Sequence, residues 1–284
     1  MAAQNPAGSV SAHYTRADLG TTILDTLRAM GKDPDALVPD DLAPIDQFHL
    51  RGKDATLELA NLAGIRSGQQ ILDVGGGLGG PARTLASMFD CRVTVLDLTE
   101  EFCRTGEMLT ERTSLQDRVT FRHGNALQMP FEDGSFDVAW TQHSTMNIPD
   151  KPRLYAEIAR VLRPGGRLAM HEVMAGPVQP LVFPVPWAPD QSISFLLPPE
   201  EMRAAIEGAG LSEGAWVDVT TPALEWLRAR VAAFQGGPPA TPQLGLNLIL
   251  GPAIGVTFQS LIRNIEERRV VVVEALFERE QTNR

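Results

Sequence analysis

Residues 71–80 read Ile-Leu-Asp-Val-Gly-Gly-Gly-Leu-Gly-Gly, and this stretch decides the fold. An apolar run that carries one acid ends in closely spaced glycines, and residues 81–89 then continue as a helix-like stretch. Glycine tolerates the backbone conformations of a tight turn, so the pattern predicts a strand, a turn and a helix, as in nucleotide-binding folds. Asp97 ends the next apolar run, about 20 residues on, where such folds hold a ribose.

The chain around this turn alternates between two kinds of hydrophobic pattern. We expect strands at 70–75, 92–97, 118–123, 136–141 and 166–173, and helices at 81–89, 100–113 and 151–163. Such alternation predicts an α/β fold, a doubly wound and mostly parallel sheet with helices on both faces. Before it we expect disorder over residues 1–12, a helix over 15–30, a loop over 33–50 and a helix over 54–65.

The pattern changes after residue 175. Residues 176–199 hold seven prolines, which predicts a structured loop. We then expect a helix at 199–208, a strand at 215–220, helical segments at 222–234 and 252–269 around a Gly/Pro loop, and a last strand at 270–277. We therefore divide the chain into a tail and helical cap (1–50) and a main domain (51–284), in which 222–269 is an insertion placed as a substrate lid.

The glycine turn by itself leaves two cofactors open. Gly75, Gly77 and Gly80 also satisfy the G-x-G-x-x-G spacing of dinucleotide-binding proteins. Asp73 and the segments 124–131 (GNALQMPF) and 161–166 (VLRPGG) favour S-adenosylmethionine (SAM) instead. With residues 46–49, 79–83, 140–143 and 146–148, they make residues 41–211 resemble the class I SAM-dependent methyltransferases. Taken together, these segments are similar to those of the small-molecule branch that includes sarcosine/dimethylglycine, tocopherol and ubiquinone/menaquinone methyltransferases.

The resemblance implies a seven-stranded sheet with an antiparallel last strand, SAM as cofactor and S-adenosylhomocysteine as product. Asp97 would accept from both ribose hydroxyls, and Asp73 would face the ammonium group of the cofactor. The glycines would let backbone N–H groups approach its methionine part. Asn125 stands where the family usually has Asp, and its side-chain oxygen can still accept from the adenine amine. The implied cofactor-binding set is Asp73, Gly75, Gly77, Gly79, Asp97, Leu98, Asn125, Ala126 and Thr141.

Methyl transfer asks little of protein side chains beyond alignment and exclusion of water, unless the acceptor carries a proton. His143 follows the fourth predicted strand, and an imidazole suits proton abstraction, although it could equally hydrogen-bond the cofactor or the loop. His49 and Tyr14, on the cap, are further catalytic candidates that could also only pack. His171 and Glu172 end the fifth strand and could orient a substrate. No spacing predicts a metal site.

The charge, cysteine content and apolar segments of the chain limit the partners and the location that we expect for it. A net charge of −10 with scattered basic residues disfavours nucleic acid. Cys91 and Cys103 lack a disulfide or zinc pattern, which suits a reducing compartment. Residues 246–258 are too short and too interrupted by Gly and Pro for a membrane span, and residues 1–10 lack an apolar targeting core, so we expect a cytoplasmic location. A homodimer remains open.

The sequence therefore predicts a SAM-dependent methyltransferase for a small-molecule acceptor, with N-, O- and C-methylation all open. The apolar Pro-rich loop, in which Phe183 and Trp187 could form a wall for the acceptor, favours a hydrophobic natural-product, terpenoid or quinone-like acceptor over a sarcosine-like amino acid. These two aromatic residues, like Trp226 and Phe258 of the insertion, are of a kind that more often belongs to a core than to a pocket. Two alternatives remain: a nicotinamide-dependent oxidoreductase, and a SAM-binding relative without methyl transfer, such as a cyclase.

Overall fold

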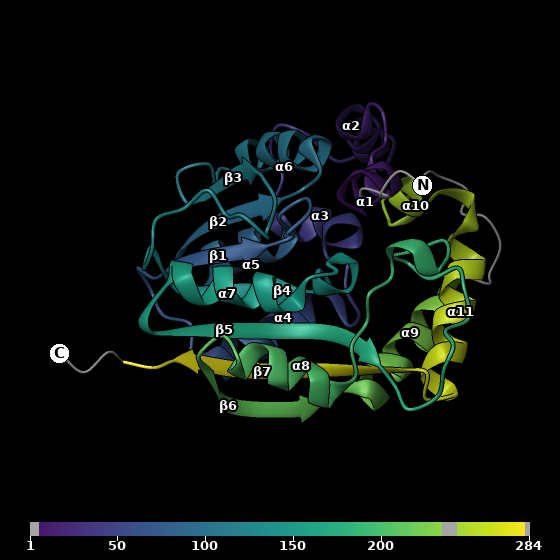
Figure 1. Cartoon of the computed structure of the whole chain (residues 1–284). Coiled ribbons are helices and arrows are strands. Elements are labelled where there is room, and N and C mark those ends of the chain that lie inside the picture. The colour runs from purple at the N-terminus through teal and green to yellow at the C-terminus, as the bar shows by residue number, and fades with distance from the viewer. Residues whose placement is uncertain (1–5, 235–242, 282–284) are drawn as a thin grey trace.

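A seven-stranded sheet runs through the part of the chain that the computed structural model describes, residues 6–234 and 243–281 (Figure 1). The strand order is β3-β2-β1-β4-β5-β7-β6. β1 to β5 are parallel to one another, whereas β7 runs antiparallel to both β5 and β6. This arrangement confirms the predicted fold class. The strands are β1 Gln70–Val74, β2 Arg92–Asp97, β3 Val119–His123, β4 Phe136–Gln142, β5 Leu162–Ala175, β6 Leu211–Asp218 and β7 Val270–Arg279.

Helices cover both faces of this sheet because its central strands β1, β4 and β5 bury side chains on both sides. On one face α4 (Gly52–Ala63), α5 (Gly80–Phe89) and α6 (Glu100–Arg112) share a core with β1, β2 and β3. On the other face α7 (Lys151–Val161) and α8 (Pro199–Glu207) share a core with β4, β5 and β7. The sheet is thus sandwiched, and its carboxyl-terminal edge is left for further elements.

A third core lies at that edge, where the cap and the insertion pack together (Figure 1). It combines side chains from α2 (Leu19–Ala29), from the Pro-rich loop and from α11 (Ile254–Glu266). Leu19, Ile23 and Leu27 on α2 are at most 1% exposed, as their helical spacing predicts. The two ends of the chain therefore close over the same region of the sheet.

Two predictions for the cap are wrong. Residues 6–14 form helix α1 (Pro6–Tyr14), whereas we expected disorder through residue 12; residues 1–5 lie outside the described part. α1 gives no periodic signal because Val10 and Tyr14 supply its main apolar contacts, and tertiary packing holds it. Residues 33–50 include helix α3 (Pro39–Asp46). Asp41 accepts a hydrogen bond from the Val38 N–H at 3.0 Å and so starts this helix.

The insertion lies between β6 and β7 in the chain, as predicted. It comprises α9 (Thr220–Phe234), α10 (Asn247–Leu250), the 3₁₀ turn η3 (Gly251–Ala253) and α11. Residues 235–242, which hold much of the expected Gly/Pro loop, lie outside the described part. By length and composition alone, Asn247–Glu266 qualifies as a candidate membrane span, with a mean hydropathy of 1.3. A core helix of a soluble protein meets the same test, and 39% of this window is buried inside the chain.

Candidate active site

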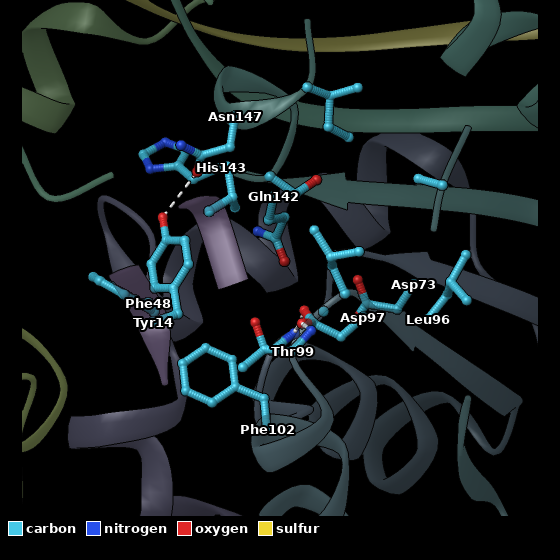
Figure 2. A pocket seen from close by; sticks show the side chains of 18 of the residues that line it. Tyr14, Phe48, Asp73, Leu96, Asp97, Thr99, Phe102, Gln142, His143 and Asn147 are labelled. Carbon is cyan, nitrogen blue, oxygen red and sulfur yellow. Dashed lines mark hydrogen bonds between the residues drawn. The ribbon is translucent and has the colours of Figure 1, made fainter. Parts of the chain in front are cut away.

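A cavity of about 320 Å³ opens at the carboxyl ends of β1, β2 and β4, beneath α1 (Figure 2). Asp73 and Asp97 lie on one side of it, and Tyr14 and Phe48 lie on the other. This is the edge at which parallel α/β sheets bind ligands, and the volume is that of a small-molecule site. Predicted site residues on its wall are Tyr14, His49, Asp73, Gly75, Gly77, Asp97, Leu98, Asn125, Ala126 and His143.

The glycine turn forms the floor of the cavity. Gly75 and Gly77 have φ values of 73° and 55°, and a Cβ on Gly75 would lie 2.5 Å from the Ser144 Cβ. Their N–H groups donate to Leu96 O and to Asp97 Oδ2 at 2.7 and 2.9 Å, so these two groups already have acceptors within the chain. The turn therefore brings its backbone close to the cavity while Asp97 stabilises its shape.

Gly79 has a different task from the one predicted. It precedes α5 with φ of 79°, and a Cβ there would meet the Phe121 ring at 2.6 Å, so it serves helix packing and is not on the cavity wall among the described residues. Gly76 takes a place on the wall instead. A Cβ on Gly76 would lie 2.5 Å from Asp73 Oδ2, and the glycine thus leaves room for that carboxylate.

Two buried carboxylates face the cavity. Asp97 accepts from the N–H groups of Gly77 and Thr99, one at each oxygen, which leaves lone pairs on both oxygens for further donors. Burial raises the pKa of Asp97, against the effect of these hydrogen bonds. Asp73 is 1% exposed, and its Oδ2 has no partner in the described chain. Burial, with the Asp97 charge, raises the pKa of Asp73 to about 8.

An apolar compartment lies beyond Asp97. Leu98, Phe102 and Ala126 line it, so it can take a flat ring. Asn125 is at its edge, where its Oδ1 accepts from the Leu127 N–H at 2.9 Å. One lone pair of this oxygen is still available to an amine.

His143 lies in the turn after β4, in a left-handed conformation with φ of 48° that is rare outside glycine. Its N–H donates to His171 O at 2.9 Å. The Glu172 carboxylate accepts from the N–H groups of Ser144 and Thr145 at 3.3 to 3.4 Å and so holds the turn. Burial raises the pKa of Glu172 to about 7. The His143 Nε2 atom is shielded from solvent and has no hydrogen-bond partner in residues 6–234 and 243–281.

The cap contributes Tyr14 and His49. The Tyr14 hydroxyl donates to Asn147 Oδ1 at 2.9 Å, as the dashed line in Figure 2 marks. Burial raises the pKa of Tyr14 far above its ordinary value, so the hydroxyl keeps the proton that it donates. Asn147 Nδ2 in turn donates to the Trp187 and Ile193 carbonyls, both at 2.8 Å. This asparagine therefore joins α1 to the Pro-rich loop.

His49 is buried, and its Nε2 lies 2.9 Å from Gly52 O and 3.2 Å from Thr56 Oγ1. Burial lowers the pKa of His49 to about 3, so the ring is neutral. Because a carbonyl oxygen only accepts, Nε2 carries the hydrogen and donates to Gly52 O, which leaves Nδ1 as the acceptor of the neutral ring.

A second cavity of about 50 Å³ adjoins the first, and both have Tyr14, Phe48, His49 and His143 on their walls. Every other residue that lines the second cavity is apolar. They come from the cap, the turn after β4, the Pro-rich loop and the insertion: Leu50, Met146, Pro186, Trp187, Trp226, Leu227, Leu246, Phe258 and Leu261. Trp187, Trp226 and Phe258 thus line this cavity, whereas Phe183 is not on its wall in the described chain.

Sequence reasoning did not assign Gln142, Ser144 and Asn147, although Gln142 and Asn147 belong to the quoted segments 140–143 and 146–148 and Ser144 lies between these segments. Gln142 Nε2 and Ser144 Oγ line the first cavity and have no partners in the described parts of the chain. Thr141, which was predicted to bind cofactor, is fully buried beside Glu172 and is not among the residues on the wall. Alternation along β4 turns its side chain away from Gln142.

Comparison with known proteins bears on the alternatives that the sequence left open. Residues 72–170, from β1 into β5, match the sequence model of the family described as "Methyltransferase domain". These residues form a methyltransferase domain. The match includes Asp73, the glycine turn, Asp97 and His143, and it supports the methyltransferase prediction over the nicotinamide alternative.

Curated relatives resemble part of this chain and not the whole of it. The 27-O-demethylrifamycin SV methyltransferase of Amycolatopsis mediterranei is 34% identical over 138 residues, which are 49% of this chain and 50% of that protein. The sterol 24-C-methyltransferase of Eremothecium gossypii is 40% identical over 40% of this chain and 31% of its own length. The chain thus spans half or less of the length of these relatives.

A solved structure shares the architecture well beyond the methyltransferase domain. Geranyl diphosphate C-methyltransferase of Streptomyces coelicolor A3(2), in complex with Mg²⁺, geranyl diphosphate and S-adenosylhomocysteine, aligns over 98% of this chain and 99% of its own with a TM-score of 0.69. At 18% identity this likeness shows the fold, including the cap and the insertion.

Proposed function

We propose that this chain binds SAM in the larger cavity and transfers its methyl group to an apolar small molecule whose reacting end enters the smaller one, which has room for only a few carbon atoms. The observation that carries the proposal is the junction of the two cavities. A cavity with two buried carboxylates shares Tyr14, Phe48, His49 and His143 with a second cavity whose remaining walls are apolar. The methyltransferase domain supplies most of the first, and the cap, the Pro-rich loop and the insertion supply most of the second.

The residues of the larger cavity suit the groups of SAM. Asp73 Oδ2 is a buried acceptor without a partner in residues 6–234 and 243–281, and an ammonium group would supply one. Gln142 Nε2 is a buried donor that likewise has no partner in the described chain, and it would suit the carboxylate of the methionine part. Asp97 retains acceptor capacity for the ribose hydroxyls, and the Leu98, Phe102 and Ala126 compartment suits the adenine ring.

When bound, SAM supplies a methyl group that its sulfonium activates toward nucleophiles. The chain supplies alignment, exclusion of water and a hydrogen-bond acceptor. The Tyr14–Asn147 hydrogen bond closes α1 over the cavities, and the apolar wall keeps water from the reacting atoms. The neutral His143 ring offers Nε2 to a hydrogen on the acceptor's nucleophilic atom.

The composition of the smaller cavity favours an uncharged acceptor. Lys and Arg are absent from the residues that line it in the described chain, so the carboxylate of a sarcosine-like amino acid would be buried there without a counter-charge. A terpenoid, quinone or polyketide would instead bury apolar surface. We propose such an acceptor, methylated at an atom that reaches His143.

The test uses purified full-length chain. Calorimetry with SAM and with S-adenosylhomocysteine measures cofactor binding. Incubation with SAM and matched sets of apolar acceptors and small amino acids, followed by mass spectrometry, measures product and S-adenosylhomocysteine. We expect both cofactors to bind and methylated product to form from the apolar set. Absence of any heat would refute SAM binding, and product from the amino acids alone would refute the acceptor class.

A second function has one supporting observation. The structure described as the [4+2]-cyclase SpnF aligns over 97% of each chain with a TM-score of 0.70 at 21% identity, so the same architecture exists in a protein named for cyclisation. A cyclase of this kind would hold SAM and an apolar substrate, yet release no S-adenosylhomocysteine. If the incubation yields a rearranged substrate of unchanged mass and no S-adenosylhomocysteine, this second function would replace methyl transfer as the proposal.

A further inference from the structure

Three histidines from distant parts of the chain meet beside the junction of the two cavities. The rings of His143 and His171 are stacked, with centroids 4.9 Å apart and planes within 5°. His49 meets the edge of both, at 6.2 and 5.8 Å. Only His143 and His49 line the cavities, so His171 acts from behind them.

His171 is held by acceptors at both ring nitrogens. Its Nε2 lies 3.1 Å from Leu50 O, and its Nδ1 lies 3.1 Å from Glu274 Oε1. A carbonyl oxygen can only accept, so Nε2 carries a hydrogen. Arg51 Nη1 lies 3.4 Å from the same Glu274 oxygen, which favours an ionised carboxylate that also only accepts. Nδ1 therefore carries a hydrogen as well, and the geometry makes His171 an imidazolium.

The charges form an alternating row from the surface to the core. Glu58, half-exposed, pairs with Arg51; Arg51 reaches Glu274; and Glu274 faces the fully buried His171. Each buried charge in the row thus has a counter-charge in contact, which is the condition for burying it. The row ends at the face of the His143 ring.

We propose that the His171–Glu274 pair positions His143 and keeps its ring neutral, so that Nε2 is available as a hydrogen-bond acceptor for the methyl acceptor. The inference rests on the proposed function for that last role. His171 O fixes the His143 backbone in its left-handed conformation, and the His171 ring fixes the plane of the His143 ring. A second proton on His143 would place two cations face to face, which is unfavourable.

The other groups around His143 agree with this arrangement. Burial, then His171, then His49 lower the pKa of His143 well below its ordinary value. Tyr14 shares the cavity wall and remains a neutral phenol. Glu172, at the base of the turn, is engaged by the N–H groups of Ser144 and Thr145. His143 therefore holds a hydrogen bond from the acceptor without storing its proton at neutral pH.

Nuclear magnetic resonance of ¹⁵N-histidine in the full chain, without cofactor, tests the pair directly. The chain has five histidines, and single His→Gln variants assign their signals. Because both ring nitrogens face acceptors, we expect wild-type His171 to carry hydrogens on both at pH 7 while His143 stays neutral. A singly protonated His171 at pH 7 would overturn the proposal.

Glu274→Gln supplies the second measurement. Without the carboxylate, His171 should lose one proton, and His143 should become protonated at higher pH than in the wild type. Glu58→Gln is the matched control, because it makes the same change at the outer end of the row, where the Glu58 side chain is 52% exposed. Unchanged titration of His143 in E274Q, or an equal change in E58Q, would contradict the pairing.

Kinetics connects the pair to turnover. If the chain transfers methyl groups, kcat of E274Q at pH 6 should fall on the order of tenfold relative to wild type while SAM affinity stays unchanged. An unchanged kcat–pH profile in an active E274Q enzyme would refute the catalytic consequence. Absence of methyl transfer in the wild type would refute the proposed function instead, and the resonance measurements would still decide the state of the pair.

Discussion

Asp73→Asn should raise folding stability and lower SAM affinity, because one buried carboxylate governs both. In the ligand-free chain Asp73 is 1% exposed, and burial with the Asp97 charge raises its pKa from 3.8 to about 8. The folded chain then binds this proton more tightly than the unfolded chain does. The free energy of unfolding therefore falls as the pH rises from about 4 to about 8, by at most about 5 kcal/mol.

The amide of the variant carries no charge, so this loss disappears. Since the amide must itself be buried, we expect a net gain of about 2 to 3 kcal/mol at pH 8, or roughly 5 to 10 °C in Tm. At pH 5, where the wild-type carboxyl is protonated, the gain should vanish. Loss of a charge-assisted hydrogen bond to the ammonium should cost about 1.5 to 3 kcal/mol of binding, or roughly 10- to 100-fold in Kd for SAM.

Thermal unfolding at pH 5 and pH 8 and calorimetry with SAM measure the two effects. Asp117→Asn is the control, because Asp117 is exposed before β3, and this variant should change neither quantity. A lower Tm for D73N at pH 8 would refute the argument that the carboxylate destabilises the ligand-free chain. Unchanged SAM affinity would refute its contact with the ammonium group.

Three further predictions concern the two cavities. Asp97→Ala should weaken SAM binding by about 1.5 to 3 kcal/mol in calorimetry, and an unchanged Kd would reject the ribose contact. His143→Ala should lower kcat roughly 100-fold with little change in SAM affinity, and a loss explained by affinity alone would exclude His143 from the reaction. Trp226→Ala, on the partly exposed insertion, should raise KM for an apolar acceptor roughly tenfold and leave the SAM Kd unchanged; equal effects on both would place Trp226 outside the acceptor wall.

The sheet and the cofactor end of the site could be predicted because their signals are local. Asp73, the glycines and Asp97 lie within one β-α-β unit, and the alternation of strands and helices determines which edge they share. Helix α1 was missed because its stability comes from contacts with residues far along the chain, such as the Tyr14–Asn147 hydrogen bond.

The sequence could not predict the His171–Glu274 pair for the same reason. The two residues are 103 positions apart, and only the antiparallel register of β7 on β5 makes them neighbours. The prediction for Gly79, in contrast, rested on local spacing alone. Its spacing fits a ligand-binding glycine, yet the Phe121 ring, supplied by β3, explains why no side chain fits there.

The wall of the smaller cavity is built from several separate segments, namely the cap, the turn after β4, the Pro-rich loop and the insertion. Grafting any single one of these segments from another enzyme would leave mismatched shapes at the seams with the others. A change of substrate scope in this scaffold, by evolution or by engineering, should therefore require coordinated substitutions in several segments while the nucleotide-binding half stays constant.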